Sequence, residues 1–207
     1  MKYILVRHVE TVGNAERRLN GHTESEYTDY GLAMKAILED ALVALNDRMP
    51  IDAIYASPIQ RAYQIGKTVA ERLGLECVTE DDLKEFNFGI FDGLTADEAM
   101  AKDPETWNRW MADYNFVQLP GGERYEDYHN RLKAFLERHA EAHADKTVLI
   151  VAHGGTVHSL LVNLLDLPLA SKWHFNVRLG SITIVDCPEG YGILEALYTP
   201  DYSQIEI

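Results

Sequence analysis

Two apolar stretches that each end in a histidine organise this sequence: Tyr3-Ile4-Leu5-Val6-Arg7-His8 and Lys146-Thr147-Val148-Leu149-Ile150-Val151-Ala152-His153. Continuous apolar runs rich in β-branched residues are typical of strands buried on both faces. Shorter candidate strands lie at residues 51–56 and 76–79. Because strands of this kind occur in parallel sheets covered by helices, the runs predict an α/β protein.

Amphipathic patterns between these runs predict helices. One follows from the spacing of apolar residues from Met34 to Leu45, and a second covers residues 62–73 and ends at Gly74. Two more are predicted after Gly121-Gly122 and after Gly154-Gly155. Strands that alternate with helices predict a three-layer α/β/α fold with a largely parallel mixed sheet, to which residues 179–186 and 193–198 add a hairpin.

The segment of residues 86–120 is irregular and rich in aromatic residues. It predicts a small helical cap inserted into the α/β fold. The sequence contains neither an internal repeat nor a linker that separates two parts. We therefore expect residues 1–207 to form a single domain that includes the cap.

The chain is acidic, with 19 Lys and Arg residues against 33 Asp and Glu residues and a formal net charge of −14. This charge argues against nucleic acid and anionic membranes as partners. The two cysteines, Cys77 and Cys187, suit a reducing compartment, and the first apolar run is too short for a signal peptide. We expect a cytoplasmic protein; the oligomeric state stays open, with a homodimer as one alternative.

Cationic and donor side chains follow three of the predicted strands. Arg7 and His8 end the first strand, His153 follows the strand at 146–152, and Arg61 lies just after the strand at 51–56. The carboxyl ends of parallel strands meet at one edge of a sheet, where ligands bind. Arginine forks and helix N-termini suit a phosphate group, so the sequence predicts a phosphate site at this edge.

These residues belong to motifs that occur together in a known family. The first is Arg7-His8-Val9-Glu10-Thr11 with Asn14, and the others follow along residues 3 to about 165: Gly21-His22-Thr23-Glu24, Thr28 with Gly31, Ser57-Pro58-Ile59-Gln60-Arg61-Ala62, Leu83-Lys84-Glu85 with Gly89 and Asp92-Gly93, Pro120-Gly121-Gly122-Glu123, and Ala152-His153-Gly154-Gly155. In order and spacing they resemble the histidine phosphatase superfamily, also called the phosphoglycerate mutase-like family.

The resemblance implies a role for each matching residue. His8 would be the nucleophile that carries the phosphoryl group, and Arg7, Arg61 and His153 would hold its oxygens. Asn14 would assist, and Glu85 would be the proton donor. We add Thr11, His22 and Gly154 as candidate phosphate- or substrate-binding residues. No step needs a metal or another cofactor, and adjacent arginines would repel a metal from the alternative ligand set of His8, His22, His153 and His158.

The charges around His8 agree with this assignment. A ring nitrogen of His8 must be unprotonated to attack phosphorus, and Arg7, Arg61 and His153 would lower its pKa. Val9 is a departure, because the family usually has glycine after the catalytic histidine. This β-branched residue could narrow the pocket, reorient His8, or be harmless where the backbone is extended.

The segment between Glu85 and His153 is compact, like that of the phosphatase branch of the family. We therefore expect a metal-independent phosphomonoester hydrolase, of the histidine acid phosphatase type, that acts on a small phosphorylated metabolite. Two alternatives stay open. One is a cofactor-dependent phosphoglycerate mutase, and the other is a non-catalytic phosphate-binding or interaction module weakened by Val9.

Overall fold

The computed structural model describes residues 1–205 and contains a six-stranded sheet. The strand order is β3-β2-β4-β1-β5-β6. All four predicted strands and the predicted hairpin are confirmed, with these bounds: β1 Lys2–Arg7, β2 Ala53–Ala56, β3 Cys77–Thr79, β4 Thr147–Ala152, β5 Ile182–Asp186 and β6 Ile193–Tyr198. The last two residues of the predicted domain, 206 and 207, lie outside the described part.

The predicted helices are also present. Gly74 adopts a φ of 69° at the end of the second predicted helix, a conformation that glycine reaches without strain. The α-helices are α1 Val12–Ala15, α2 Asp29–Asn46, α3 Gln60–Leu73, α4 Ala96–Lys102, α5 Pro104–Ala112, α6 Tyr125–Ala140 and α7 Gly154–Leu164. Short 3₁₀ helices cover Asp81–Leu83, Gly89–Phe91, Leu169–His174 and Pro188–Gly190.

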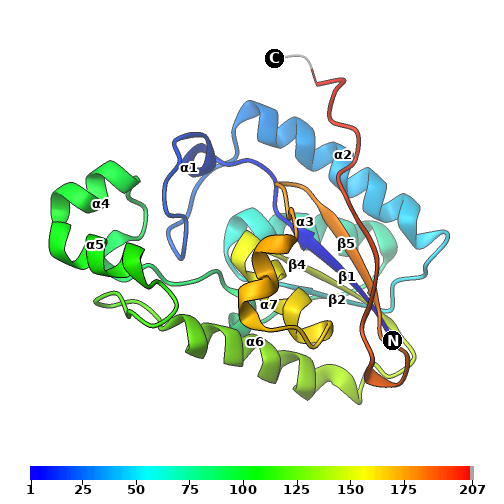
Figure 1. The fold of residues 1–207 in the computed structure, drawn as a ribbon. Coiled ribbons are helices and arrows are strands. Elements are labelled where there is room, and N and C mark those ends of the chain that lie inside the picture. Colours follow the sequence, from blue (N-terminus) through cyan, green and yellow to red (C-terminus); the bar gives the residue numbers. More distant parts are fainter. Residues whose placement is uncertain (206–207) are drawn as a thin grey trace.

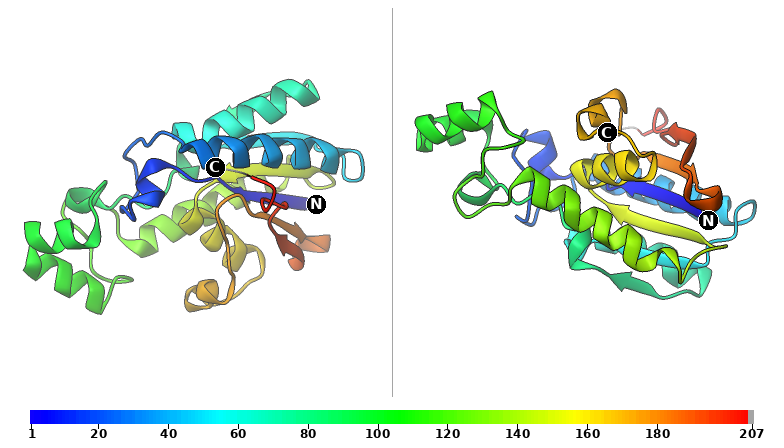
Figure 2. Two further views of the ribbon diagram at one scale, coloured as in Figure 1. Left: turned by 90° about the horizontal axis from the view of Figure 1, so that it is seen from above. Right: turned by 60° about the horizontal axis from the view of Figure 1, so that its bottom comes forward.

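Helices cover both faces of the sheet, as Figures 1 and 2 show. Alternate side chains of β1 point to opposite faces because successive residues of a strand do so. Ile4 and Val6 pack with α2 and α3, whereas Tyr3 and Leu5 pack with α6 and α7. Every residue of β4 is buried, as expected for a strand covered on both sides. The predicted three-layer α/β/α fold is therefore confirmed.

The sheet is mixed in the way that the sequence predicts. Strands β1, β2, β3 and β4 are parallel, and β5 and β6 add an antiparallel pair beside β1. From β1 the chain continues to α2 on one face, and from β4 it continues to α7 on the other. β1 and β4 are neighbouring parallel strands, and the helices that follow them lie on opposite faces of the sheet. Such an arrangement leaves a crevice at the carboxyl ends of the two strands.

The segment at 86–120 is helical where the sequence predicts a cap. Helices α4 and α5 form a pair with a small core of its own, made of Phe91, Ala99, Trp110 and Leu119. The pair projects beyond the carboxyl end of β1, away from the N-terminus (Figures 1 and 2). Within residues 1–205, no helix has the length and apolar character needed to cross a membrane.

Candidate active site

Two histidines meet at the crevice between β1 and β4. His8 follows directly after β1, and His153 is the N-cap residue of α7, directly after β4. Their ring centroids lie 5.3 Å apart at an interplanar angle of 66°. Both side chains are buried, with 3% and 0% of their surface exposed. The parallel pairing of β1 with β4 thus unites residues that are far apart in the chain.

His8 is held as a neutral imidazole with a defined tautomer. Its Nδ1 atom lies 2.7 Å from the carbonyl oxygen of Val9. A carbonyl oxygen can only accept, so Nδ1 carries the proton and Nε2 keeps a free lone pair. Burial lowers the pKa of His8 well below 6.5, and the charges of Arg61 and Arg7 lower it further. The ring therefore presents an unprotonated nitrogen at neutral pH.

His153 is anchored by a serine that follows β2. Its Nε2 atom lies 2.8 Å from Ser57 Oγ, which also accepts a hydrogen bond from the backbone N–H of Ile59 at 3.3 Å. The Ser57 hydroxyl can donate to His153 Nε2 or accept from it, so this contact fixes the orientation of the ring. Burial lowers the pKa of His153 well below its ordinary value, and Arg61 and His8 add to the effect.

Two arginines lie beside the histidines and are fixed by backbone carbonyls. Arg61, in the first turn of α3, donates to the carbonyls of Thr23, Asn20 and Gly21 at 2.7–3.0 Å. Arg7 Nη1 donates to the carbonyl of Val177 at 2.8 Å. Burial lowers the pKa of both side chains, but a guanidinium stays charged in proteins.

Several buried nitrogen atoms in this site have no hydrogen-bond partner within residues 1–205. They are Arg7 Nε, Arg61 Nε and His153 Nδ1. A buried polar group without a partner is unfavourable by about 1–3 kcal/mol, and a bound ion is one way to supply the partner. The two arginine nitrogens are donors in a cationic setting, so an anion with several oxygens fits them. The residues predicted to hold a phosphate group have the donors to do so.

Glu85 lies at the edge of the same site and receives three hydrogen bonds. Tyr128 donates its hydroxyl to Oε1 at 2.6 Å, and the backbone N–H of Phe86 donates to Oε1 at 2.9 Å. The backbone N–H of Gly155 donates to Oε2 at 2.9 Å. The carboxyl group is therefore fixed in orientation by donors from three segments of the chain.

A cavity of about 290 Å³ opens beside these groups. Arg7, Glu85, Gly154, Gly155 and His158 form its polar lining, and aromatic rings form the rest: Phe86, Phe88, Tyr125 and Trp173. The predicted residues Arg7, Glu85 and Gly154 thus line one cavity. Its size suits one small molecule that carries both a charged group and an apolar part.

Comparison with known proteins identifies the family of this chain. The sequence profile of the histidine phosphatase superfamily, branch 1, matches residues 3–199. The chain belongs to the histidine phosphatase superfamily. It is 30% identical to phosphoserine phosphatase 1 of Hydrogenobacter thermophilus, covering 94% of this chain and 90% of that one.

Two further similar proteins are alpha-ribazole phosphatases. The chain is 29% identical to an adenosylcobalamin/alpha-ribazole phosphatase of Salmonella typhimurium, covering 95% of this chain and 96% of that one. The crystal structure of the alpha-ribazole phosphatase of Shigella flexneri superposes with a TM-score of 0.87 at 26% identity, covering 98% and 97% of the two chains. The comparisons thus confirm the family resemblance and the fold over almost the whole chain.

Three further residues that the sequence predicts to bind phosphate or substrate are Thr11, Asn14 and His22. They lie around the histidine phosphatase site and contact other groups of the protein. Thr11 is the N-cap residue of α1, and its hydroxyl lies 2.9 Å from Asn14 Oδ1. His22 is exposed, and its Nε2 atom lies 3.0 Å from the carbonyl oxygen of Glu85. Thr11 and Asn14 bond to each other and His22 rims the site, so their contact with phosphate stays a prediction.

Val9 stands where this superfamily usually has glycine, and its side chain avoids the site. Within residues 1–205, positive φ angles of non-glycine residues occur at Arg17, Asp166 and Glu189, so Val9 has no left-handed strain. Its side chain is fully buried and packs in the core formed with α2. We expected Val9 to narrow the pocket, to reorient His8, or to have no effect on the site. The geometry favours the last of these.

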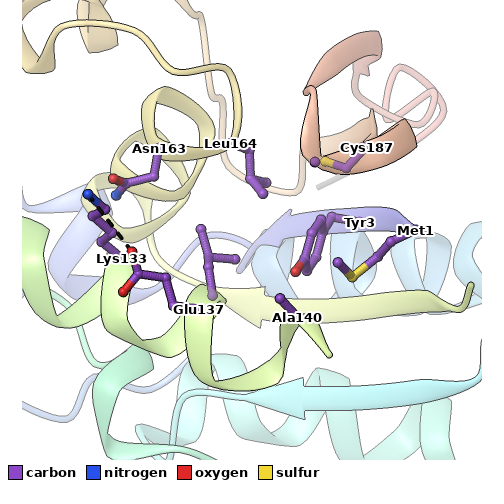
Figure 3. Close-up of a pocket in the computed structure, with 10 residues that line it drawn as sticks. Met1, Tyr3, Lys133, Glu137, Ala140, Asn163, Leu164 and Cys187 are labelled. Atoms are coloured by element: carbon purple, nitrogen blue, oxygen red, sulfur yellow. Dashed lines mark ion pairs between the residues drawn. The ribbon is translucent and has the colours of Figure 1, made fainter. Parts of the chain in front are cut away.

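A second cavity, of about 210 Å³, lies away from the two histidines (Figure 3). It opens between α6, α7 and the start of β1, beside Met1 and Tyr3. Lys133 and Glu137 form an ion pair at its rim, 3.9 Å apart. This cavity is at the amino end of β1, whereas the histidines lie at the carboxyl end. It has no part in the phosphate site.

Sequence reasoning missed two residues that shape the site. Tyr128 has the helical spacing of a core residue, and nothing in the pattern reveals its hydrogen bond to Glu85. Lys172 is only 1% exposed, and its Nζ atom lies 3.4 Å from the ring centroid of Tyr125, with Trp173 and Tyr114 close by. Burial lowers the pKa of Lys172 to about 8. No sequence signal distinguishes this lysine from a surface lysine.

Proposed function

We propose that this protein is a phosphatase that hydrolyses a small phosphomonoester through a phosphohistidine intermediate on His8. The observation that carries the proposal is the His8 ring, which is buried, neutral and bonded to Val9 so that Nε2 is free. A histidine in this state is a competent nucleophile beside two arginines. Family membership and the names of the relatives agree with hydrolysis of phosphomonoesters.

In the first half of the reaction, His8 Nε2 forms a bond to phosphorus while the bond from phosphorus to the leaving oxygen breaks. Arg7, Arg61 and His153 stabilise the charge on the equatorial oxygens in the transition state. The leaving oxygen takes the electron pair of the broken bond and receives a proton from Glu85. The alcohol then leaves, and Glu85 is a carboxylate.

In the second half, water takes the place of the alcohol. Glu85 accepts a proton from the water as its oxygen bonds to phosphorus, and the electron pair of the breaking bond to phosphorus returns to His8 Nε2. Inorganic phosphate is released, and both residues return to their starting protonation states. The proposed cycle uses only groups of this chain, and we therefore expect chelators to leave the activity unchanged.

The walls of the 290 Å³ cavity favour an alcohol with an apolar, flat part. Four aromatic rings line it: Phe86, Phe88, Tyr125 and Trp173. Rings of this kind stack against a flat ring carried by the alcohol. We therefore propose that the leaving group is a ring-bearing alcohol, for which the alpha-ribazole phosphatases offer a closer analogy than the phosphoserine phosphatases.

The decisive test compares the wild type with His8→Ala on a panel of phosphomonoesters between pH 5 and pH 8. We expect phosphate release and an acid-labile phosphoenzyme from the wild type, and a loss of turnover of at least about 1,000-fold without phosphoenzyme in the variant. His129→Gln is a matched control, because His129 lies outside the site and bonds to Ser159. It should keep wild-type turnover.

Other outcomes would select the alternatives. Isomerisation of 3-phosphoglycerate that depends on a bisphosphorylated cofactor would indicate a mutase. No turnover on any ester, together with unchanged phosphate affinity in His8→Ala, would indicate a binding module. Equal turnover in His8→Ala and the wild type would refute the phosphohistidine mechanism.

A further inference from the structure

The two oxygens of the Glu85 carboxyl group are not equivalent. Oε1 accepts two hydrogen bonds, from the Tyr128 hydroxyl and the Phe86 backbone, whereas Oε2 accepts one, from the Gly155 backbone. A carboxylate oxygen has two lone pairs in the plane of the group. Oε1 is therefore saturated by protein donors, and Oε2 has one lone pair left.

Tyr128 is built to remain a donor at this position. Its side chain is fully buried, and burial raises its pKa well above the ordinary value, with the charge of Glu85 adding to the effect. The hydroxyl therefore keeps its proton at neutral pH. The Tyr128 oxygen also lies 2.9 Å from Thr156 Oγ1, which donates to the carbonyl of Lys84 at 3.3 Å.

The absence of a side chain at Gly155 makes space for the contact between Tyr128 and Glu85. A Cβ atom at Gly155 would lie 2.6 Å from Glu85 Oε1 and 3.0 Å from the Tyr128 hydroxyl oxygen. Real Cβ atoms do not approach oxygen that closely without displacing it. The first turn of α7 therefore allows the tyrosine and the carboxyl group to meet, and it supplies the donor to Oε2 as well.

We propose that Tyr128 is a positioning residue that keeps the transferable proton of Glu85 on Oε2 in both halves of the reaction. The inference rests on the proposed function, in which Glu85 is the acid and then the base. With Oε1 occupied by Tyr128 and Phe86, the acid form carries its proton on Oε2. That proton passes to the leaving oxygen, and the proton of the attacking water returns to the same atom.

The charged and titratable groups that face Glu85 come from several elements packed around it. They are Arg7 from β1, Arg61 from α3, Tyr125 and Tyr128 from α6, and His158 from α7. His22 and Arg131 contact the backbone carbonyl of Glu85 rather than its carboxyl group. Of these side chains, Tyr128 is the one that donates a hydrogen bond to the Glu85 carboxyl group. Removal of the Tyr128 hydroxyl frees a lone pair on Oε1, so the proton of the acid form is no longer confined to Oε2.

The test uses Tyr128→Phe and two substrates that differ in the leaving group. An alkyl phosphate needs a proton on its leaving oxygen, whereas p-nitrophenyl phosphate has a leaving group that departs as an anion. We expect kcat/KM for the alkyl phosphate to fall about 10- to 100-fold, within the range for general acid catalysis. For p-nitrophenyl phosphate kcat/KM should fall less than about threefold, because its leaving oxygen needs no proton.

Tyr55→Phe is the matched control. Tyr55 lies on β2 in the same core cluster, and its hydroxyl contacts His139 and His143 at 3.2 and 2.9 Å instead of a group of the site. Loss of this hydroxyl should lower the melting temperature without a change in the pH profile. Thr156→Val removes the hydroxyl beside Tyr128 together with its hydrogen bond to the Lys84 carbonyl, and it should lower kcat/KM for the alkyl phosphate by a smaller factor than Tyr128→Phe does.

The outcomes separate this inference from the proposed function. If Tyr128→Phe lowers kcat/KM equally for both substrates, Tyr128 is structural and the inference is wrong. If Glu85→Gln hydrolyses the alkyl phosphate as fast as the wild type, the role of Glu85 fails and the inference fails with it. If the wild type forms no phosphoenzyme, the proposed function itself is refuted.

Discussion

Arg131 Nε donates to Glu123 Oε1 at 2.9 Å, and the same guanidinium group holds the backbone of the segment that carries Glu85. Its Nη2 atom donates to the carbonyls of Lys84 and Glu85 at 2.9 and 3.2 Å. Glu123 in turn accepts from the backbone N–H of Asn87. The pair thus ties the loop on both sides of Glu85 to α6.

We expect Arg131→Met to lower kcat about tenfold with little change in KM, because Glu85 loses its fixed position while the phosphate donors stay in place. The free energy of unfolding should fall by about 2 kcal/mol, since several backbone carbonyls lose a charged donor. Arg138→Met is the control on the same helix, where a half-exposed arginine contacts only surface carboxylates. Equal kinetic effects of the two variants would contradict this role of Arg131.

Val9→Gly restores the residue that the superfamily usually has after the catalytic histidine. The contact with His8 comes from the carbonyl oxygen of Val9, which glycine also has. We expect kcat to stay within about threefold, while unfolding by urea should show a loss of about 2–3 kcal/mol from the missing buried side chain and the added chain entropy. A rise in kcat of more than about tenfold would show that the valine side chain limits the reaction.

Stability should fall as the pH drops below 6.5. Both His8 and His153 have a pKa well below 6.5 in the folded protein because they are buried, whereas in the unfolded chain they titrate near 6.5. Between these values the unfolded state binds protons that the folded state does not. The free energy of unfolding should then decrease by as much as about 1.4 kcal/mol per pH unit for each histidine.

Urea unfolding at several pH values between 7.5 and 5.0 measures this slope. His8→Gln should reduce the slope by the contribution of one histidine, whereas a substitution of the exposed His174 should leave the slope as it is. A wild-type stability that stays constant over this range would mean that the two histidines do not remain neutral in the folded protein.

Substitution of Trp173 tests the proposed preference of the enzyme for a flat, apolar leaving group. Its ring lines the 290 Å³ cavity and donates from Nε1 to the Tyr114 hydroxyl at 2.6 Å. We expect Trp173→Ala to raise KM about tenfold for an aryl phosphate and less than about twofold for glycerol phosphate, which cannot use the ring. Phe116→Ala, at an exposed position outside the cavity lining, should change neither value. Equal effects of Trp173→Ala on both substrates would contradict the preference.

The sequence by itself determined the fold class and the edge of the sheet where the candidate site lies. Apolar runs of β-branched residues define β1 and β4 because strands buried on both faces leave no room for polar residues. Arg7 ends β1, and His8 and His153 directly follow β1 and β4, so their meeting at one edge follows from parallel pairing alone. Motif order then indicated the superfamily, which the comparisons confirm over residues 3–199.

Only the tertiary structure decided which hydrogen bonds orient the reacting groups. The proton of His8 is placed by a carbonyl oxygen, and the carboxyl group of Glu85 is oriented by Tyr128, which is 43 residues further along the chain. Tyr128 follows the same helical pattern as its purely apolar neighbours in α6. Spacing along one helix reports which side chains are buried, but the partner of a buried hydroxyl depends on how separate segments pack together.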